Sequence, residues 1–287
     1  MSRPIIERAD ALRPVLVASH PRSGTHLAID LLRRQFRSFD NWRIWGFPLD
    51  HLYLNLERLG ADNRRFPEIL ARKIINRPRR ALMKTHFDAD FVTGWSEDES
   101  IPPSQTWLDF LDQAHLLYVL RHPIDVMVSY HQFLSGIDER LSELDLMSFL
   151  RSSHWDGSAN RLEWWNRHVV GWVERECVIV VRYEDIVRQT GKTLALVSNC
   201  LDEAPVGRDP LLPPKTISIR RTRFDRVLRL SPPSTAIVAD RNRFRASEWR
   251  QSLTKSDVAW IEQQIGPSLI RFGYALDPEA SVNPLLQ

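Results

Sequence analysis

The residues best suited to chemistry near the N-terminus lie in one short segment, His-Pro-Arg-Ser-Gly-Thr-His at 20–26. Arg22 carries a forked cation that suits oxyanions, and Ser23 and Thr25 add hydroxyl donors. Gly24 has no side chain, so the main chain can come close to an anion there. These residue types favour a site for phosphate or sulfate. Glycine turns that bind nothing are also common, and the segment alone leaves both interpretations open.

The flanking sequence predicts the strand–turn–helix that an anion site needs. Residues 15–18, Val-Leu-Val-Ala, favour a buried strand, and the apolar spacing after Thr25 favours a helix. A helix N-terminus has unpaired N–H groups and a partial positive charge, which together stabilise a bound oxyanion. The segment is P-loop-like but is not a Walker A loop, which has two glycines, four residues between them, and then Lys and Ser or Thr.

Strand and helix patterns alternate along the rest of the chain. Residues 39–80 and 88–108 are predicted to be irregular or loop-forming. Strands are predicted at 80–86, 115–123 and 177–185, and helices at 124–134, 158–175, 190–202 and 255–271. Apolar strands joined by helices imply strands buried on both faces. We therefore predict a three-layer α/β fold, with a mostly parallel central sheet and helices on both of its faces.

Each predicted strand runs into polar residues at its end. Lys84 and His86 end one strand, Arg121 lies at the end of the next, and Tyr183 lies at the end of the last. Ligands of open parallel sheets bind beyond the carboxyl ends of the strands. Together with Arg22, these residues predict one cationic rim containing a histidine, which suits the transfer of an anionic group. Taken singly, polar strand ends are ordinary.

Length and composition favour one soluble domain with a sizeable hydrophobic core. The chain has 287 residues, of which 43% are hydrophobic, enough for a sizeable core. We expect a single domain over 1–287, with no membrane span and no secretory signal in 1–14. Cys177 and Cys200 lie far apart and are predicted to be core thiols of a reducing, cytoplasmic compartment. No Cys/His cluster has structural zinc spacing, so no such metal site is predicted.

The basic residues are mostly arginine. Of 39 Lys and Arg residues, five are lysine, which leaves 34 arginines, and the formal net charge is +3. Such a preference can reflect GC-rich coding, and it also suits forked phosphate binding. Clusters at 220–226 and 241–245 alternate Arg with Phe. These clusters are compatible with a solvated face or with a surface for oxyanions and bases.

Taken together, the motifs resemble those of the PAPS-dependent sulfotransferases, which move a sulfuryl group from 3′-phosphoadenosine 5′-phosphosulfate (PAPS). The segment 20–26 resembles the family's 5′-phosphosulfate loop. The segment 118–133, YVLRHPIDVMVSYHQF, resembles its 3′-phosphate segment. KTH at 84–86 is similar to the strand that carries the family's general base, and YED at 183–185 also recurs in the family. The segment 241–254 resembles the late segment that closes over the nucleotide.

The resemblance implies a role for each matching residue. His86 would be the general base, Arg22 would stabilise the leaving phosphate, and Lys84 would stabilise the sulfuryl oxygens. Arg121 and Ser129, eight residues apart, would hold the 3′-phosphate that distinguishes PAPS from ATP. The implied nucleotide-binding residues are Arg22, Ser23, Gly24, Thr25, His26, Arg121, Ser129, Tyr183, Arg243 and Arg245. PAPS would be the co-substrate and PAP, which is 3′,5′-ADP, the product, with no metal required.

The sequence departs from the family pattern at several places, including Arg22, where the cytosolic branch has Lys. Leu27 stands where the cytosolic branch has an adenine-stacking tryptophan, so another aromatic residue, such as Phe224, would have to stack on the purine. Aligned on Trp249, the late segment lacks the usual glycines and has Ser247 at the second of them, although Arg243 and Arg245 keep the charge. Main-chain contacts to the nucleotide in this segment are therefore in doubt.

Two other functions compete with sulfuryl transfer. A P-loop-type nucleotide kinase would share the sheet and the anion loop, but it needs a Walker A lysine–hydroxyl pair and a carboxylate for Mg²⁺. An arginine-rich nucleic-acid-binding module would use the clusters at 220–226 and 241–245, but it would not explain the polar strand ends. We predict a small-molecule acceptor, reacting through a hydroxyl or an amine, and no nucleic-acid partner. The sequence predicts neither the acceptor's identity nor the oligomeric state.

The 3′-phosphate assignment yields a prediction that needs no acceptor. 3′,5′-ADP is expected to raise the melting temperature more than 5′-AMP at the same concentration, because 5′-AMP has no 3′-phosphate for Arg121 and Ser129 to hold. Thermal denaturation with each nucleotide measures the difference. Equal shifts from the two ligands would contradict the assignment.

Overall fold

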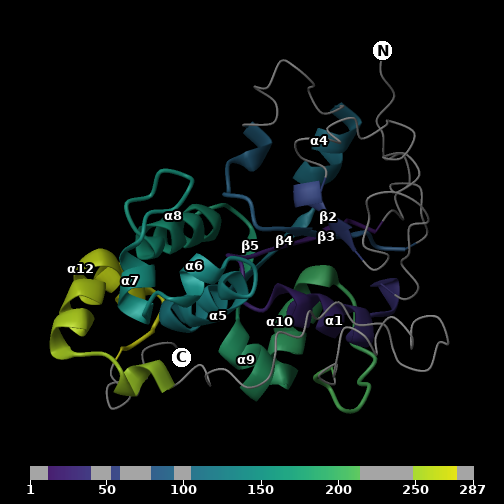
Figure 1. Ribbon diagram of the computed structural model, residues 1–287. Coiled ribbons are helices and arrows are strands. Elements are labelled where there is room, and N and C mark those ends of the chain that lie inside the picture. Colours follow the sequence, from purple (N-terminus) through teal and green to yellow (C-terminus); the bar gives the residue numbers. More distant parts are fainter. Residues whose placement is uncertain (1–11, 40–52, 59–78, 94–104, 214–247, 277–287) are drawn as a thin grey trace. The chain divides into compact units, whose positions relative to one another are not determined.

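The computed structural model describes residues 12–39, 53–58, 79–93, 105–213 and 248–276 (Figure 1). Contacts between residues divide the chain into two compact units. Unit 1 comprises the described residues within 1–19, 23–120 and 172–238, and unit 2 those within 20–22, 121–171 and 239–287. The single domain expected over 1–287 remains a prediction.

Unit 1 contains a five-stranded sheet in the order β2-β3-β1-β4-β5, in which every neighbouring pair is parallel. The strands are β1 (Val15–Ala18), β2 (Leu54–Asn55), β3 (Leu82–Thr85), β4 (His115–Leu120) and β5 (Val178–Arg182). All residues of β1 and β3 are buried. The continuous apolar run of β1 is what the middle of a parallel sheet favours, whereas β3 buries a lysine and a threonine at its end. The predicted parallel α/β fold is confirmed.

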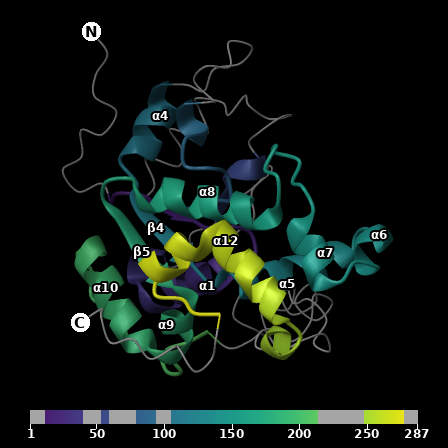
Figure 2. The ribbon, with the colours of Figure 1, turned by 90° about the vertical axis from the view of Figure 1, so that its left-hand side faces the viewer.

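Helices cover both faces of this sheet, as expected. In Figures 1 and 2, α4 (Gln105–Asp112) lies on one side and α1 (Thr25–Gln35), α9 (Tyr183–Arg188) and α10 (Thr190–Leu201) lie on the other. None of the helices that the structure describes combines the length and the apolarity of a membrane span.

The prediction that both cysteines are core thiols was wrong. Cys177 is exposed and Cys200 is partly exposed.

Three predicted boundaries were wrong. The short strand β2 and the 3-10 helix η2 (Leu56–Arg58) lie in a stretch predicted to be irregular, because two strand residues are too few to show a period. Helix α4 begins inside the loop predicted for 88–108. Tyr183, Glu184 and Asp185 form the first turn of α9 rather than the end of a strand, and the two carboxylates suit the positive end of that helix.

The strand ends of unit 1 meet at one edge. Ala18, the last residue of β1, pairs with Thr85 of β3 and with Tyr118 of β4, while Leu120 pairs with Arg182 of β5. The residues that follow these strands therefore leave the sheet close together. Ser19 and His86 are in this position in unit 1.

Unit 2 is helical in its described part. Its helices are α5 (Pro123–Ser135), α6 (Glu139–Ser142), α7 (Leu146–Arg151), most of α8 (Arg161–Val173), η3 (Glu248–Gln251) and α12 (Lys255–Arg271). Pro123 occupies the first turn of α5, where its missing N–H costs nothing. The Thr254 side chain and Asp257 form a reciprocal capping box at the start of α12. The predicted helices at 158–175 and 255–271 are confirmed.

A buried aromatic cluster forms part of the core of unit 2. The His20 ring is fully buried, with its centroid 4.0 Å from that of Trp164, and the His154 ring stacks on the same indole at 3.7 Å. Burial, followed by the nearby His168, lowers the pKa of His20 well below its usual value. Burial also lowers the pKa of His154, against the opposing effect of Asp156. The folded unit therefore favours neutral rings at both positions.

His115, at the start of β4 in unit 1, generates a prediction about stability and pH. Burial, followed by the charges of Arg13 and Arg80, lowers the pKa of His115 from 6.5 to about 4. Between those values the unfolded chain takes up a proton that the folded chain does not, so the free energy of unfolding falls as the pH falls through this window.

We expect His115→Gln to lose less stability than the wild type between pH 7.5 and pH 5. The difference is expected to be on the order of 1 kcal/mol after allowance for solvent screening of a half-exposed group. Urea titrations at the two pH values measure it, and the pH 7.5 values separate the titration from any direct effect of the substitution. An equal pH-dependent loss in both proteins would contradict the assignment.

Candidate active site

The loop after β1 turns sharply through two residues with left-handed backbone. Arg22 has φ 69° and Gly24 has φ 102°. Gly24 is the N-cap of α1 and makes no side-chain cap, so the first N–H groups of the helix are not capped from that position. The predicted strand–turn–helix is confirmed, and its helix begins at Thr25 as expected.

Tyr183 explains why position 24 must be glycine. A Cβ built on Gly24 would lie 2.4 Å from Cδ2 of Tyr183, closer than real Cβ contacts. The first residue of α9 therefore packs its ring directly on the loop after β1. The sequence placed Tyr183 among the nucleotide-binding residues, and the structure places its ring beside the loop.

Ser19 connects the loop to His86 within unit 1. The hydroxyls of Ser19 and Thr25 are 2.5 Å apart, and Nδ1 of His86 lies 2.7 Å from the Ser19 carbonyl oxygen. A carbonyl can only accept, so Nδ1 donates the proton, and in the neutral ring the lone pair is then on Nε2. The structure thus selects one tautomer of His86.

The other polar residues of the loop in unit 1 are packed against the rest of the unit. Ser23 and Thr25 are buried, and the ring of His26 meets that of Tyr53 edge-on, with centroids 5.7 Å apart. Buried hydroxyls carry a desolvation cost unless a partner satisfies them.

Lys84 is buried at the end of β3 and forms an ion pair. Its Nζ lies 2.8 Å from Oε2 of Glu57 and 3.5 Å from Oδ1 of Asn55. The other oxygen of Glu57, Oε1, accepts a short hydrogen bond from the His86 N–H. One carboxylate therefore contacts both residues of the KTH segment that the sequence singled out.

Unit 2 brings together Arg22, Arg121 and Ser129. Nε of Arg22 donates to Oγ of Ser129 at 3.3 Å, and Arg121 donates to the main-chain oxygen of Arg22 at 3.0 Å. The Arg22 guanidinium also lies over the Phe133 ring, 5.1 Å from its centroid. Burial, followed by the charge of Arg121, lowers the pKa of Arg22. Two neighbouring cations that repel each other are stabilised when an anion binds between or beside them.

The structure therefore places the predicted residues in two groups. Gly24, Thr25, His86 and Tyr183 meet around the loop in unit 1, whereas Arg22, Arg121 and Ser129 meet in unit 2. The single cationic rim expected from the sequence remains a prediction. Arg243 and Arg245 lie outside the described residues, as do Phe224 and both arginine–phenylalanine clusters.

Trp249, in the segment 241–254, lies within the described residues and is buried. Its Nε1 donates to Oδ1 of Asp125 at 2.6 Å, and its ring packs near His122, with centroids 5.3 Å apart. These contacts attach η3 to the first turn of α5. Within the described ranges, no group of three or more His, Cys, Asp or Glu residues is arranged to hold a metal ion.

Sequence reasoning missed Ser19 and Glu57. Ser19 acts through its main-chain carbonyl, for which residue type gives no signal. Glu57 follows a two-residue strand in a stretch without periodicity, and only the pairing of Asn55 with Lys84 across β2 and β3 brings it to the site. No feature of the sequence could have identified it.

The parallel sheet and the glycine turn after β1 define the class of the protein, an α/β protein with a tight strand–turn–helix at the end of its first strand. Residues 12–269 match the sequence model of a protein family described as "Sulfotransferase domain". The chain therefore belongs to the sulfotransferase family.

Individual relatives are more distant. A 3-alpha-hydroxysteroid sulfotransferase from Cavia porcellus is 32% identical over 99 residues, which are 32% of this chain and 32% of that protein. The crystal structure of mouse sulfotransferase SULT7A1 complexed with PAP is 18% identical, with a TM-score of 0.49, and the match covers 89% of this chain and 83% of that one. The crystal structure of retinol dehydratase in complex with androsterone and inactive cofactor PAP is 17% identical, with a TM-score of 0.44. The match covers 90% of this chain and 80% of that one.

The packing of Tyr183 on the loop generates a test with a built-in control. Gly24→Ala meets both a left-handed φ and the Tyr183 ring, whereas Gly157→Ala meets a φ of 90° with nothing within 4 Å of the new Cβ. We expect Gly157→Ala to cost about 1–2 kcal/mol for backbone strain and Gly24→Ala to cost more. Gly24→Ala should also weaken 3′,5′-ADP binding at least 10-fold. Stability by urea denaturation and affinity by calorimetry check both, and equal behaviour of the two variants would show that Tyr183 does not constrain the loop.

Proposed function

We propose that the protein transfers a sulfuryl group from PAPS to a hydroxyl, or an amine, of a small-molecule acceptor. Sulfuryl transfer is an in-line displacement in which the acceptor loses a proton and the leaving phosphate gains charge. Positioning and fixed positive charge therefore carry most of the catalysis, as in phosphoryl transfer.

The observation that carries this proposal is the orientation of His86. Nδ1 of His86 lies 2.7 Å from the Ser19 carbonyl oxygen and donates its proton to it. The neutral ring therefore has its basic lone pair on Nε2. His86 is half-buried and follows a buried strand directly, which limits its freedom. A histidine with one tautomer selected has a lone pair free to accept a proton at the other ring nitrogen, which suits general-base catalysis.

The loop residues supply the binding that PAPS needs. Ser23, Gly24 and Thr25 would hold the 5′-phosphosulfate at the start of α1, with Tyr183 and His26 beside them. The lowered pKa of Arg22 supports an anion site in unit 2, because a bound phosphate would relieve the repulsion from Arg121. We assign the 3′-phosphate to Arg121 and Ser129, and Arg243 and Arg245 remain proposed nucleotide contacts.

Arg22 and Lys84 are the proposed electrostatic catalysts. Arg22 would stabilise charge that develops on the leaving phosphate, and its forked guanidinium can contact two oxygens at once. Lys84 would stabilise the sulfuryl oxygens. Since protein cations carry this charge stabilisation, the proposed reaction needs no metal ion.

The acceptor is tested directly by PAPS turnover against hydroxyl and amine compounds of different classes, including phenols, lipid alcohols, sugars and aryl amines. Formation of a sulfated product together with 3′,5′-ADP is expected for at least one class. If the protein binds 3′,5′-ADP but transfers the sulfuryl group to none of these compounds, the proposed reaction is contradicted.

The catalytic base is tested by His86→Ala. Removal of a general base is expected to lower kcat about 10²-fold or more, while PAPS binding and folding persist. His115→Ala is the matched control, because it removes a histidine from the opposite, amino end of the same sheet. Turnover within a few-fold of wild type, on an acceptor with an unactivated hydroxyl, would refute the role of His86.

A further inference from the structure

We propose that Glu57 is a positioning residue that holds Lys84 and His86 in one arrangement, a role that rests on the proposed function. Its two carboxylate oxygens have separate partners. Oε2 pairs with Nζ of Lys84 at 2.8 Å, and Oε1 accepts the main-chain N–H of His86. A single side chain from η2 therefore ties together the ammonium and the histidine of the KTH segment.

Burial explains why Lys84 needs this partner. The Lys84 residue is only 5% exposed, and a buried ammonium without an opposite charge loses its proton readily. A neutral amine could not stabilise sulfuryl oxygens. Glu57 is 27% exposed at its side chain, so the carboxylate reaches from the partly solvated side to the buried cation. By this argument Glu57 keeps Lys84 charged where the proposed reaction uses that charge.

The main-chain contact gives Glu57 a second effect. The His86 N–H is the first beyond the end of β3, and Glu57 satisfies it. The Ser19 carbonyl holds the ring of the same residue on its other side. His86 is therefore fixed by its main chain and by its ring, from η2 and from the end of β1 respectively. Loss of Glu57 would free one of these two attachments.

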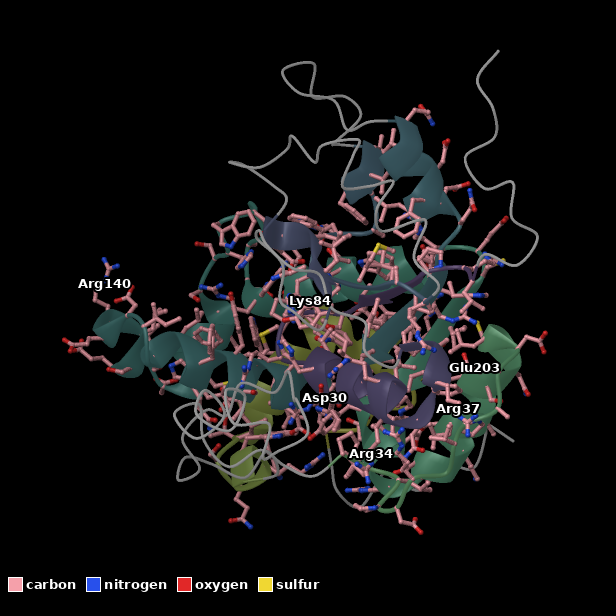
Figure 3. All side chains as sticks on the ribbon, turned by 90° about the vertical axis from the view of Figure 1, so that its right-hand side faces the viewer. Asp30, Arg34, Arg37, Lys84, Arg140 and Glu203 are labelled. Atoms are coloured by element: carbon pink, nitrogen blue, oxygen red, sulfur yellow. The ribbon has the colours of Figure 1, made fainter. Side chains whose placement is uncertain are left out.

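The chain contains a matched control at the other end of β3. Glu203 also pairs with a buried cation, lying 3.8 Å from Arg80, and it also accepts a main-chain N–H, that of Ser38 at 2.9 Å. Arg80 precedes β3, whereas Lys84 lies near its carboxyl end. In Figure 3, Glu203 lies well away from Lys84. The two glutamates thus have the same chemistry, and only Glu57 contacts residues of the proposed reaction.

The experiment compares Glu57→Gln with Glu203→Gln. Both amides keep an oxygen that can accept the main-chain N–H, and both lose the charge. We expect Glu57→Gln to lower kcat at least 10-fold, to leave 3′,5′-ADP affinity within about 2-fold, and to move the alkaline limb of the pH–rate profile to lower pH. The groups that contact the Lys84 ammonium include Glu57 from η2 and Asn55 from β2. Glu203→Gln is expected to lose stability but to retain kcat within about 2-fold.

The protonation of Lys84 can be measured directly by NMR. The chain has five lysines, so the ¹³Cε signals of labelled lysine can be assigned one by one. In Glu57→Gln the Lys84 ammonium is expected to lose its proton at lower pH than in the wild type, and in Glu203→Gln at an unchanged pH. If Glu57→Gln does not fold, the double variant Glu57→Gln, Lys84→Met removes the uncompensated charge. This variant is expected to fold and to have no more activity than Lys84→Met alone.

The outcomes separate this inference from the proposed function. A wild-type protein that transfers no sulfuryl group overturns the proposed function, and the positioning role falls with it. A wild type that transfers the group, with kcat of Glu57→Gln within 2-fold, overturns the positioning role alone. An equal loss of kcat in Glu203→Gln also overturns it, because the effect would then follow stability rather than contact with Lys84 and His86.

Discussion

The turn after β1 is the constraint on which the start of α1 and the packing of Tyr183 depend. Two of its residues, Arg22 and Gly24, have left-handed backbone, which costs on the order of 1–3 kcal/mol at a non-glycine position. The buried face of α1, which includes Ile29 and Leu32, supplies packing that can offset this cost. Because the turn is so tight, the N-terminus of α1 begins only seven residues after β1 ends. The Tyr183 ring fills the space over Gly24, so no larger residue fits at position 24 unless the ring moves.

Strand β3 shows how unit 1 accommodates buried cations. Arg80, before the strand, donates to the Ser38 hydroxyl and to the Arg13 and Leu201 carbonyls, in addition to its pairing with Glu203. Such a saturated guanidinium serves the fold, joining segments that are far apart in sequence. Lys84, near the end of the strand, is an ammonium paired with a partly exposed carboxylate. The two ends of one strand thus show two ways of pairing a buried cation, a guanidinium with several acceptors and an ammonium with a carboxylate close by.

The electrostatics of unit 2 differ from those of unit 1. Arg22 and Arg121 are held near each other despite their repulsion, an arrangement that favours an anionic ligand. Close by in sequence, His20 is buried against Trp164 with its pKa lowered, so that it contributes no further positive charge near neutral pH. His20 is thus a neutral packing residue two positions from the cationic Arg22.

Local patterns determined much of this protein. The apolar runs that became β1, β3, β4 and β5, the glycine turn, and the order of the motifs were readable from the sequence, because a buried parallel strand and a helix start each have a short-range signature. Three features were decided by tertiary structure alone: the pairing of β2 with β3, which brings Glu57 to Lys84; the Ser19 carbonyl, which selects the tautomer of His86; and the packing of Tyr183 on Gly24. Each depends on residues more than 25 positions apart in the chain. No local residue pattern encodes such contacts, because they form only when the strands align.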